Sequence, residues 1–345
     1  MTPSRRDLLA GAGALAATPA AAAAEAPSPA LQGVLDYVEG QRTTGFLVVR
    51  DRRTVVERNW PLPADAGAFR AAFAYGTTAQ GALLEDVASQ QKSFVAMLVG
   101  IAVDKGLIEV STPVSDHVGA GWSRAAPDQE RAIRVIDLLT MSSGLDERLG
   151  YAAPAGSVFL YNTPAYAVTK QVLAAAAKAP LEGLTHDWLT APAGMTDTAW
   201  RKRPAGFGDV GNPTGLVTSP RDVATFGQLV LDGGRAADGR TIVSEAQLRA
   251  MFVRSRTNPA YGRLWWLNGS ATTIRPLAKP TEGPLIPAAP AAPAAPADLV
   301  AALGALDRKL YVAPSRRLVV VRMGQAAPDK DFDQQLWLRL SKALA

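Results

Sequence analysis

One segment constrains the fold of this chain more than any other: residues 94–103 include no charged side chain. With its flanks, the segment predicts a helix over residues 89–104, and Gly106 follows at the position where helices commonly end. A helix that is apolar on nearly every side has to be buried on nearly every side. The chain of 345 residues, 48% of them hydrophobic, is long enough to enclose such a helix in a core.

Strand patterns lie at both ends of the chain, and helical patterns lie between them. The strands are expected at residues 45–49, 54–57, 69–75, 83–84, 264–267, 310–313 and 318–323. The further helices are expected at residues 133–140, 166–178, 220–231, 244–251 and 332–344. We therefore expect residues 25–105 and 255–345 to form one domain of sheet and helices, with residues 106–254 as an inserted, mainly helical domain.

The first 24 residues predict an export signal rather than part of the fold. Arg5 and Arg6 precede a short apolar stretch and an alanine run that ends at Ala24. The paired arginines resemble a twin-arginine signal, which implies the twin-arginine export machinery as a partner and a periplasmic or secreted location. The stretch is too short and too weakly apolar to span a bilayer, so no stable membrane anchor is expected after cleavage. The alternative is a disordered alanine-rich tail.

Cysteine is absent and only two histidines occur, His117 and His186, which limits the chemistry open to the chain. Disulfides, thiolate metal sites, cysteine nucleophiles and a three-histidine zinc site are excluded. Neither histidine has metal-ligand spacing, so no metal site is expected at either of them. The net charge of +5 is spread along the chain, so nucleic acid is not an expected partner. The basic run at residues 201–203 is expected to lie in a solvated loop.

Ser89 and Lys92 lie three residues apart at the start of the predicted buried helix, so their side chains share one face. A buried lysine has a lowered pKa and can act as a base at neutral pH, and a neighbouring hydroxyl is its natural target. The free N–H groups of a first helical turn also suit an oxyanion. This spacing is common by chance, however, and taken alone it is more typical of an exposed helix face.

Two further segments add candidate groups. Tyr161 follows an apolar stretch and precedes a predicted helix, and a phenol can shuttle a proton when a neighbouring cation lowers its pKa. Gly304 precedes the two C-terminal strands, where a residue without a side chain lets a backbone N–H approach a substrate. The alternatives are a structural tyrosine and a simple bend at a strand end.

Together, these segments resemble the serine β-lactamase and penicillin-binding-protein superfamily. The resemblance is closest to the branch of class C β-lactamases, family VIII carboxylesterases and 6-aminohexanoate-dimer hydrolase. Residues 88–94 resemble the Ser-x-x-Lys motif, residues 137–145 the Leu-Leu-Thr-x-x-Ser-Gly segment, and Tyr161 stands at the place of the catalytic tyrosine. Further landmarks match at residues 215–227, 261–266 and 319–322. Several landmarks in one order, over most of the chain, are more specific than any single motif.

The resemblance implies an α/β (α+β) fold, in which a mainly antiparallel sheet is flanked by helices and has a helical domain beside it. It also implies a serine hydrolase that works through an acyl-enzyme and needs neither a metal nor a cofactor. Ser89 would be the nucleophile, Lys92 its base and Tyr161 the proton relay. The backbone N–H groups of Ser89 and Ala305 would form the oxyanion hole. The residues expected to contact the substrate are Asn162, Gly304 and Trp266.

Two motifs depart from the family pattern. The third motif usually has Lys or His, then Thr or Ser, then Gly, whereas this chain has Ala302-Leu303-Gly304. The cation and the hydroxyl that hold a substrate carboxylate are therefore missing. In the tyrosine motif Asn162 is adjacent to the tyrosine and Thr163 takes the usual place of the asparagine, and either side chain could contact the substrate or Lys92.

The expected function is an exported esterase or amidase that acts on a small molecule without a carboxylate at that place. One alternative is a β-lactamase or D-Ala-D-Ala carboxypeptidase, and another is a non-catalytic binding protein with the same fold. The proline- and alanine-rich residues 286–297 precede the third motif, where they either rim the pocket or span a gap at the surface.

Overall fold

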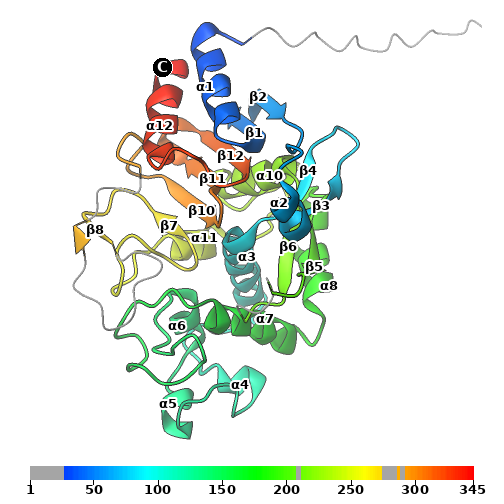
Figure 1. Ribbon diagram of the computed structural model, residues 1–345. Coiled ribbons are helices and arrows are strands. Elements are labelled where there is room, and N and C mark those ends of the chain that lie inside the picture. The colour runs from blue at the N-terminus through cyan, green and yellow to red at the C-terminus, as the bar shows by residue number, and fades with distance from the viewer. Residues whose placement is uncertain (1–26, 207–210, 274–285, 288–291) are drawn as a thin grey trace, which may run out of the picture.

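The computed structural model describes residues 27–206, 211–273, 286–287 and 292–345 (Figure 1). The predicted export signal, residues 1–24, lies outside the described residues, as does the middle of the proline- and alanine-rich segment. No helix in the described part of the chain combines the length and the apolar character that crossing a bilayer requires.

A six-stranded antiparallel sheet joins the two ends of the chain. Its strand order is β2-β1-β12-β11-β10-β7, and β1 pairs with β12, so the first strands lie beside the last ones. The two strand-rich ends of the chain therefore share one sheet. The strands are β1 (Thr43–Arg50), β2 (Arg53–Asn59), β7 (Trp266–Leu267), β10 (Val300–Gly304), β11 (Arg308–Ala313) and β12 (Leu318–Gly324).

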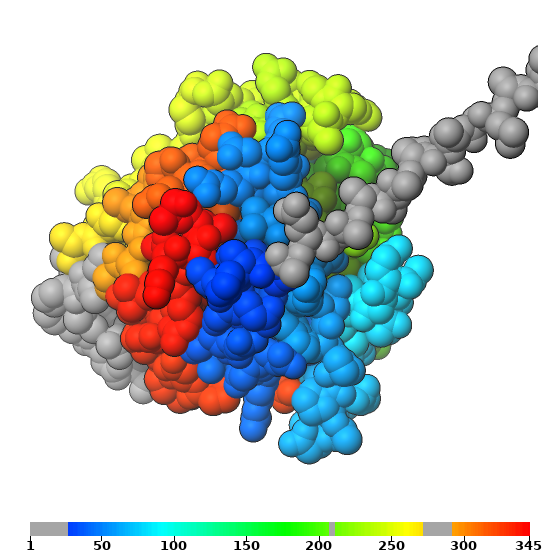
Figure 2. All heavy atoms as spheres, turned by 90° about the horizontal axis from the view of Figure 1, so that it is seen from above, coloured from blue at the N-terminus to red at the C-terminus, as the bar shows by residue number. Residues whose placement is uncertain are grey.

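Helices cover both faces of this sheet. α1 (Pro29–Gly40) and α12 (Phe332–Ala343) lie side by side over one face, as Figure 2 shows. α10 (Pro220–Leu231) packs against the opposite face. The alternation along β12 explains the two layers, because Val319 and Val321 enter the larger core while Val320 enters the core beneath α1 and α12.

α3 (Gln91–Asp104) is the central helix that the uncharged segment predicts. All its residues from 91 to 102 are buried, and a short 3-10 turn (Ala88–Gln90) precedes it. Phe94 stacks on Phe226 of α10, with ring centroids 3.8 Å apart. Gly100 allows α11 (Glu245–Met251) to approach, since a Cβ at this glycine would lie 2.6 Å from Met251 Cε.

The chain enters α3 from a smaller antiparallel sheet. Its order is β3-β4-β6-β5, and β4 ends just before the 3-10 turn. The strands are β3 (Ala74–Thr77), β4 (Leu83–Asp86), β5 (Ala199–Lys202) and β6 (Thr214–Thr218). A separate pair joins β8 (Thr272–Thr273) to β9 (Ile286–Pro287).

Short helices dominate the middle of the chain, in the lower part of Figure 1. The longest of them, α7, packs against α3 and α6 and so closes the core around the start of α3. The elements are α4 (Ser115–Val118), α5 (Pro127–Arg131), α6 (Val135–Leu139), α7 (Thr163–Ala177), α8 (Leu181–Thr185), a π-helical turn (His186–Thr190) and α9 (Ala191–Ala193).

One strand prediction was wrong and a second was right only in part. Most of the expected strand at 69–75 is the helix α2 (Gly67–Phe73), because Phe69 and Phe73, four residues apart, stack on one buried face. Of the expected strand at 264–267, only β7 forms, because Leu264 has a left-handed backbone with φ of 60°. Trp265 is fully buried and Trp266 is partly exposed.

Candidate active site

Ser89 and Lys92 face each other at the start of α3. Lys92 Nζ donates a hydrogen bond to Ser89 Oγ over 2.9 Å, which is the contact that their spacing predicts. Ser89 is partly exposed, whereas Lys92 is only 2% exposed. The pair therefore combines a hydroxyl that is open to a substrate with an amine that is shielded from water.

The surroundings of Lys92 lower its pKa to about 7. Loss of hydration is the largest cause, and the positive charges of Arg203 and Lys170 act in the same direction. The amine lies 4.9 Å from the centroid of the Tyr161 ring and 4.8 Å from that of Tyr166. A lysine with this pKa is about half neutral at pH 7, so it can accept the proton of the neighbouring hydroxyl.

Tyr161 differs from the sequence expectation in its acidity. We expected a neighbouring cation to lower the pKa of the phenol, but burial raises it to about 12, and an interaction with Ser89 offsets only part of this rise. Lys92 does not supply the expected effect, because about half of its charge is lost at pH 7 and burial of the phenol dominates. The phenol therefore stays protonated at neutral pH, so it can donate a proton, whereas the neutral amine of Lys92 can accept one.

The two residues after Tyr161 have separate roles. Thr163 is the one that meets the lysine, since its Oγ1 accepts a hydrogen bond from Lys92 Nζ over 3.4 Å. Asn162 is 1% exposed, and its Oδ1 accepts from Ala165 N and caps α7. Its Nδ2 donates to two backbone carbonyls, those of Leu145 and Asp146. These bonds hold Asn162 within the protein, so they do not support the substrate contact expected for it.

Gly304 brings the end of β10 against the segment that leads into Ser89. A Cβ at Gly304 would lie 2.3 Å from the carbonyl oxygen of Val87, so this close approach requires a glycine. Ala305 follows at an exposed turn. The structure thus brings together the two backbone segments expected to form an oxyanion hole. The N–H of Ser89 belongs to a first helical turn, in which N–H groups have no acceptor within the helix.

Tyr161, which interacts with Ser89, belongs to a cluster of three aromatic rings. Trp266 stacks on Tyr161 with ring centroids 6.0 Å apart and an angle of 23° between the rings. Tyr261 meets both rings edge-on. Because Trp266 keeps part of its surface exposed, it is placed to contact an apolar part of a substrate.

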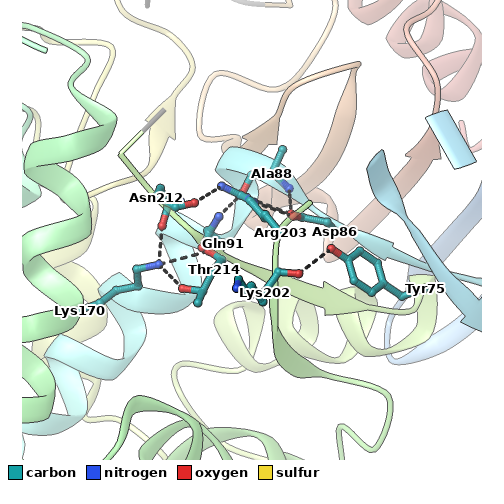
Figure 3. Close-up of polar contacts among 9 residues, drawn as sticks. All are labelled: Tyr75, Asp86, Ala88, Gln91, Lys170, Lys202, Arg203, Asn212 and Thr214. Atoms are coloured by element: carbon teal, nitrogen blue, oxygen red, sulfur yellow. Dashed lines mark hydrogen bonds and ion pairs between the residues drawn. The ribbon is translucent and has the colours of Figure 1, made fainter. Parts of the chain in front are cut away.

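A buried polar network behind the serine was not predicted. Arg203 was expected in a solvated loop, but its side chain is 3% exposed and forms a two-pronged ion pair with Asp86 (Figure 3). Arg203 also donates to the carbonyl of Asn212 over 3.1 Å. The expectation for the basic run was therefore wrong for Arg203, although Arg201 and Lys202 are exposed.

Lys170 is a second buried lysine in this network. Its amine donates to Thr214 Oγ1 over 2.8 Å and to the side chain of Asn212, and burial lowers its pKa to about 7. Helical spacing was a signal for it, because Lys170 lies four residues after Tyr166, on the face of α7 that is buried.

The two histidines lie in unrelated places. His117 contacts Thr112 over 3.1 Å, and His186 lies beside Asp187 at the surface. Within the described ranges, no three His, Asp or Glu side chains gather in a way that could hold a metal ion.

Comparisons with known proteins agree on a single fold. The family model described as Beta-lactamase matches residues 30–344. A candidate beta-lactamase from Bacteroides dorei is 16% identical, with a TM-score of 0.67 over 92% of this chain and 98% of that one. A candidate 6-aminohexanoate-dimer hydrolase from Bacillus anthracis is 14% identical, with a TM-score of 0.64 over 89% of this chain and 80% of that one.

A family VIII carboxylesterase is also similar in structure. It is 14% identical, with a TM-score of 0.62 over 92% of this chain and 97% of that one. At these identities the likeness shows a common fold, a mixed fold with an antiparallel sheet flanked by helices. No curated protein matches the sequence of this chain.

Proposed function

The chain belongs to the Beta-lactamase family, and from this membership we propose that it hydrolyses small carboxylic esters or amides through an acyl-enzyme on Ser89. The observation that carries the proposal is the 2.9 Å contact between Ser89 Oγ and the buried amine of Lys92. A serine hydroxyl is a weak nucleophile by itself, and a neutral amine within hydrogen-bonding distance is the group that activates it.

The direction of each proton transfer in acylation follows from the pKa values of Lys92, about 7, and Tyr161, about 12. Ser89 Oγ attacks the carbonyl carbon while its proton passes to neutral Lys92. The bond to the leaving group then breaks as the departing oxygen or nitrogen takes the proton of Tyr161, and the phenol regains a proton from the Lys92 ammonium. Acylation thus yields an ester on Ser89 and a neutral alcohol or amine. Lys92 is again neutral and Tyr161 is again protonated.

Deacylation repeats the sequence with water. A water molecule attacks the acyl carbonyl and gives a proton to Lys92, and Ser89 leaves as its oxygen is protonated through Tyr161. In both steps the N–H groups of Ser89 and Ala305 would stabilise the negative charge that develops on the carbonyl oxygen.

The surroundings of the site favour a substrate without a carboxylate at the third motif. Ala302 is 1% exposed and packs into the larger core, so it offers neither charge nor hydrogen bond. Leu303 packs with the core on the opposite side of the sheet. Trp266 adds an apolar surface beside Tyr161. These residues support an ester or amide with an apolar acyl group over a β-lactam or a D-Ala-D-Ala peptide, both of which present a carboxylate.

The test is intact-mass spectrometry of the protein during hydrolysis of p-nitrophenyl butyrate, with Ser89→Ala as the matched control. We expect a butyryl adduct and steady release of p-nitrophenol from the wild type alone. A chromogenic cephalosporin in parallel separates the β-lactamase alternative, and we expect little turnover of it. A folded wild type with neither adduct nor turnover on ester, amide and cephalosporin probes would favour the non-catalytic alternative.

We also propose export to the periplasm or the exterior, supported by Arg5 and Arg6 ahead of the apolar stretch. Cell fractionation tests this with the full chain and with Arg5→Lys/Arg6→Lys. We expect export of the first protein only, and equal export of the two would contradict a twin-arginine signal.

A further inference from the structure

Two neighbouring carboxylates end strand β4, and both are buried. Glu85 and Asp86 are each 0% exposed, and the alternation of a strand points their side chains in opposite directions. Each meets a buried guanidinium, Asp86 that of Arg203 and Glu85 that of Arg308. Burial of four charges is costly even when they are paired, so their position directly before the candidate nucleophile calls for a physical reason.

Asp86 holds the residue that precedes Ser89. Its Oδ1 accepts a hydrogen bond from Ala88 N over 2.8 Å, while Arg203 binds both carboxylate oxygens over 2.7 and 3.0 Å (Figure 3). Ala88 has a φ of 49°, in the left-handed region that alanine rarely adopts. This conformation therefore depends on contacts that hold it.

Gln91 holds the other side of the same residue. Its Nε2 donates to the carbonyl oxygen of Ala88 over 2.9 Å. The Ala88 carbonyl and the Ser89 N–H belong to one planar peptide unit, so this bond also sets the direction of the Ser89 N–H. That N–H is the first of the two expected oxyanion donors.

Gly215 on β6 makes room for the Asp86 carboxylate. A Cβ at Gly215 would lie 1.9 Å from Asp86 Oδ2, closer than any real contact. On the far side, Asn212 accepts from Arg203 through its carbonyl and from Lys170 through its side chain (Figure 3). The carboxylate is thus enclosed by the smaller sheet and its polar network.

Glu85, whose side chain points to the side of β4 opposite to that of Asp86, contacts Arg308. Its Oε2 lies 3.1 Å from Arg308 Nη2, and its Oε1 accepts from the hydroxyl of Thr44. Arg308 Nη1 in turn donates to the carbonyl oxygen of Ala305 over 2.9 Å, and its guanidinium lies 4.2 Å from the centroid of the Phe73 ring. Ala305 carries the second expected oxyanion donor.

The turn after Ala305 needs such support. Leu306 and Asp307 both have left-handed backbones, with φ of 61° and 59°. Neither is a glycine, so this conformation carries a steric cost that neighbouring contacts must offset. Arg308 anchors the turn at its end, inside the protein.

We propose that Glu85 and Asp86 are positioning residues that hold the two backbone donors of the oxyanion hole in place, Asp86 through the backbone conformation of Ala88 and Glu85 through Arg308. The inference rests on the proposed hydrolase function. Neither carboxylate contacts the substrate. Donors that are fixed before the reaction stabilise the transition state more than donors that must reorganise, and buried ion pairs supply this rigidity.

The experiment compares Glu85→Gln and Asp86→Asn with the wild type. The probes are p-nitrophenyl butyrate, for kcat and KM, and an alkyl trifluoromethyl ketone, which adds reversibly to a serine and places an alkoxide in the oxyanion hole. We expect kcat to fall by about 10- to 100-fold in each variant, with KM changed by less than about threefold. The inhibition constant of the ketone should rise by the same factor as kcat/KM falls.

Glu130→Gln is the matched control, because Glu130 is a carboxylate 3% exposed that binds the backbone of Gly121 and Ser123. It belongs to α5, which Figure 1 shows far from β4. The substitution should lower the melting temperature and leave kcat unchanged. Ala88→Gly adds a rescue, because glycine adopts a φ of 49° without steric cost. Added to Asp86→Asn, it should raise kcat by about fivefold or more. Added to Glu85→Gln, it should leave kcat unchanged.

The outcomes separate the two proposals. If both variants fold and keep kcat and the ketone constant within about threefold of the wild type, the positioning role is overturned. If Asp86→Asn does not fold, Gln91→Met takes its place. It removes the hydrogen bond to the Ala88 carbonyl and leaves no buried charge without a partner. If Glu85→Gln does not fold, Glu85→Gln with Arg308→Met takes its place. A wild type that neither hydrolyses the ester nor binds the ketone overturns the hydrolase function itself.

Discussion

The amine of Lys92 lies 4.9 Å from the ring centroid of Tyr161, and burial shifts the pKa values of these two neighbours in opposite directions. The pKa of the amine falls to about 7 and that of the phenol rises to about 12. Burial penalises the charged form of each group, which is the ammonium of lysine and the phenolate of tyrosine. One environment therefore prepares a base and an acid side by side.

The first prediction concerns the pH dependence of hydrolysis. Because Lys92 must be neutral to accept the proton of Ser89, kcat/KM should rise about tenfold per pH unit below pH 7 and level off above it. Neither a second rise nor a fall is expected between pH 8 and 9.5, because Tyr161 stays protonated there. The measurement is kcat/KM for p-nitrophenyl butyrate from pH 5.5 to 9.5, corrected for spontaneous hydrolysis. A rate that does not change from pH 6 to 9 would contradict Lys92 as the base.

The second prediction concerns Lys92→Met. Methionine fills the buried volume without an amine, so the variant should fold while kcat falls by about a thousandfold or more. Lys92→Ala should be nearly as inactive as Ser89→Ala. A folded Lys92 variant with near-normal turnover would remove the lysine from the mechanism.

The same substitution gives a third prediction, on stability. The pKa of Lys92 is about 7 in the folded protein and 10.5 for an ordinary lysine, so between these values the unfolded chain binds more protons. Wild-type stability should therefore rise with pH across this window relative to Lys92→Met. We expect the methionine variant to be the more stable one, by most below pH 7 and by least near pH 10. Urea unfolding of both proteins at several pH values measures this, and a gap that widens with pH would contradict it.

The fourth prediction concerns Gly304→Ala. The new Cβ would lie 2.3 Å from the Val87 carbonyl oxygen, so the end of β10 must move away from the segment before Ser89. We expect kcat to fall by about 100-fold with a smaller change in KM, because the Ala305 donor moves with the strand. Gly183→Ala is the control, since nothing lies within 4 Å of a Cβ there. Equal kcat in both variants would show that this approach has no part in catalysis.

The fifth prediction concerns substrate preference. Trp266 stacks on Tyr161 and is partly exposed, so Trp266→Leu should weaken binding of esters with large acyl groups. KM for p-nitrophenyl benzoate should rise by about 3- to 10-fold, while KM for the acetate changes little. Kinetics on the two esters check this, and equal effects on both would show that Trp266 does not contact the acyl group.

Several elements were predictable because their signals are local. The uncharged residues 94–103 predicted α3, and the bounds expected for α10, residues 220–231, are those observed. Ser89 and Lys92 share a face because helical geometry alone puts residues three apart together. The strand expected at 69–75 was wrong because its apolar residues suit either structure, and packing of Phe69 on Phe73 decided for a helix.

The polar network was not predictable from local pattern. Arg203 stands in a basic run typical of the surface, and its partner Asp86 lies 117 positions away. Asn162, next to the motif tyrosine, was expected to contact the substrate, yet its bonds to the backbone around Leu145 make it part of the scaffold. Such roles depend on which chain segments meet, and the sequence around each residue does not contain that information.

By itself, the sequence determined the buried helix, the neighbouring positions of Ser89 and Lys92, and the strands that close the main sheet, because periodicity and spacing act over a few residues. Tertiary structure alone decided the acidity of Tyr161, the burial of Arg203 and the enclosure of Glu85 and Asp86. The physical reason is that pKa and ion pairing follow from the loss of water. How much water a side chain loses depends on distant segments that fold over it.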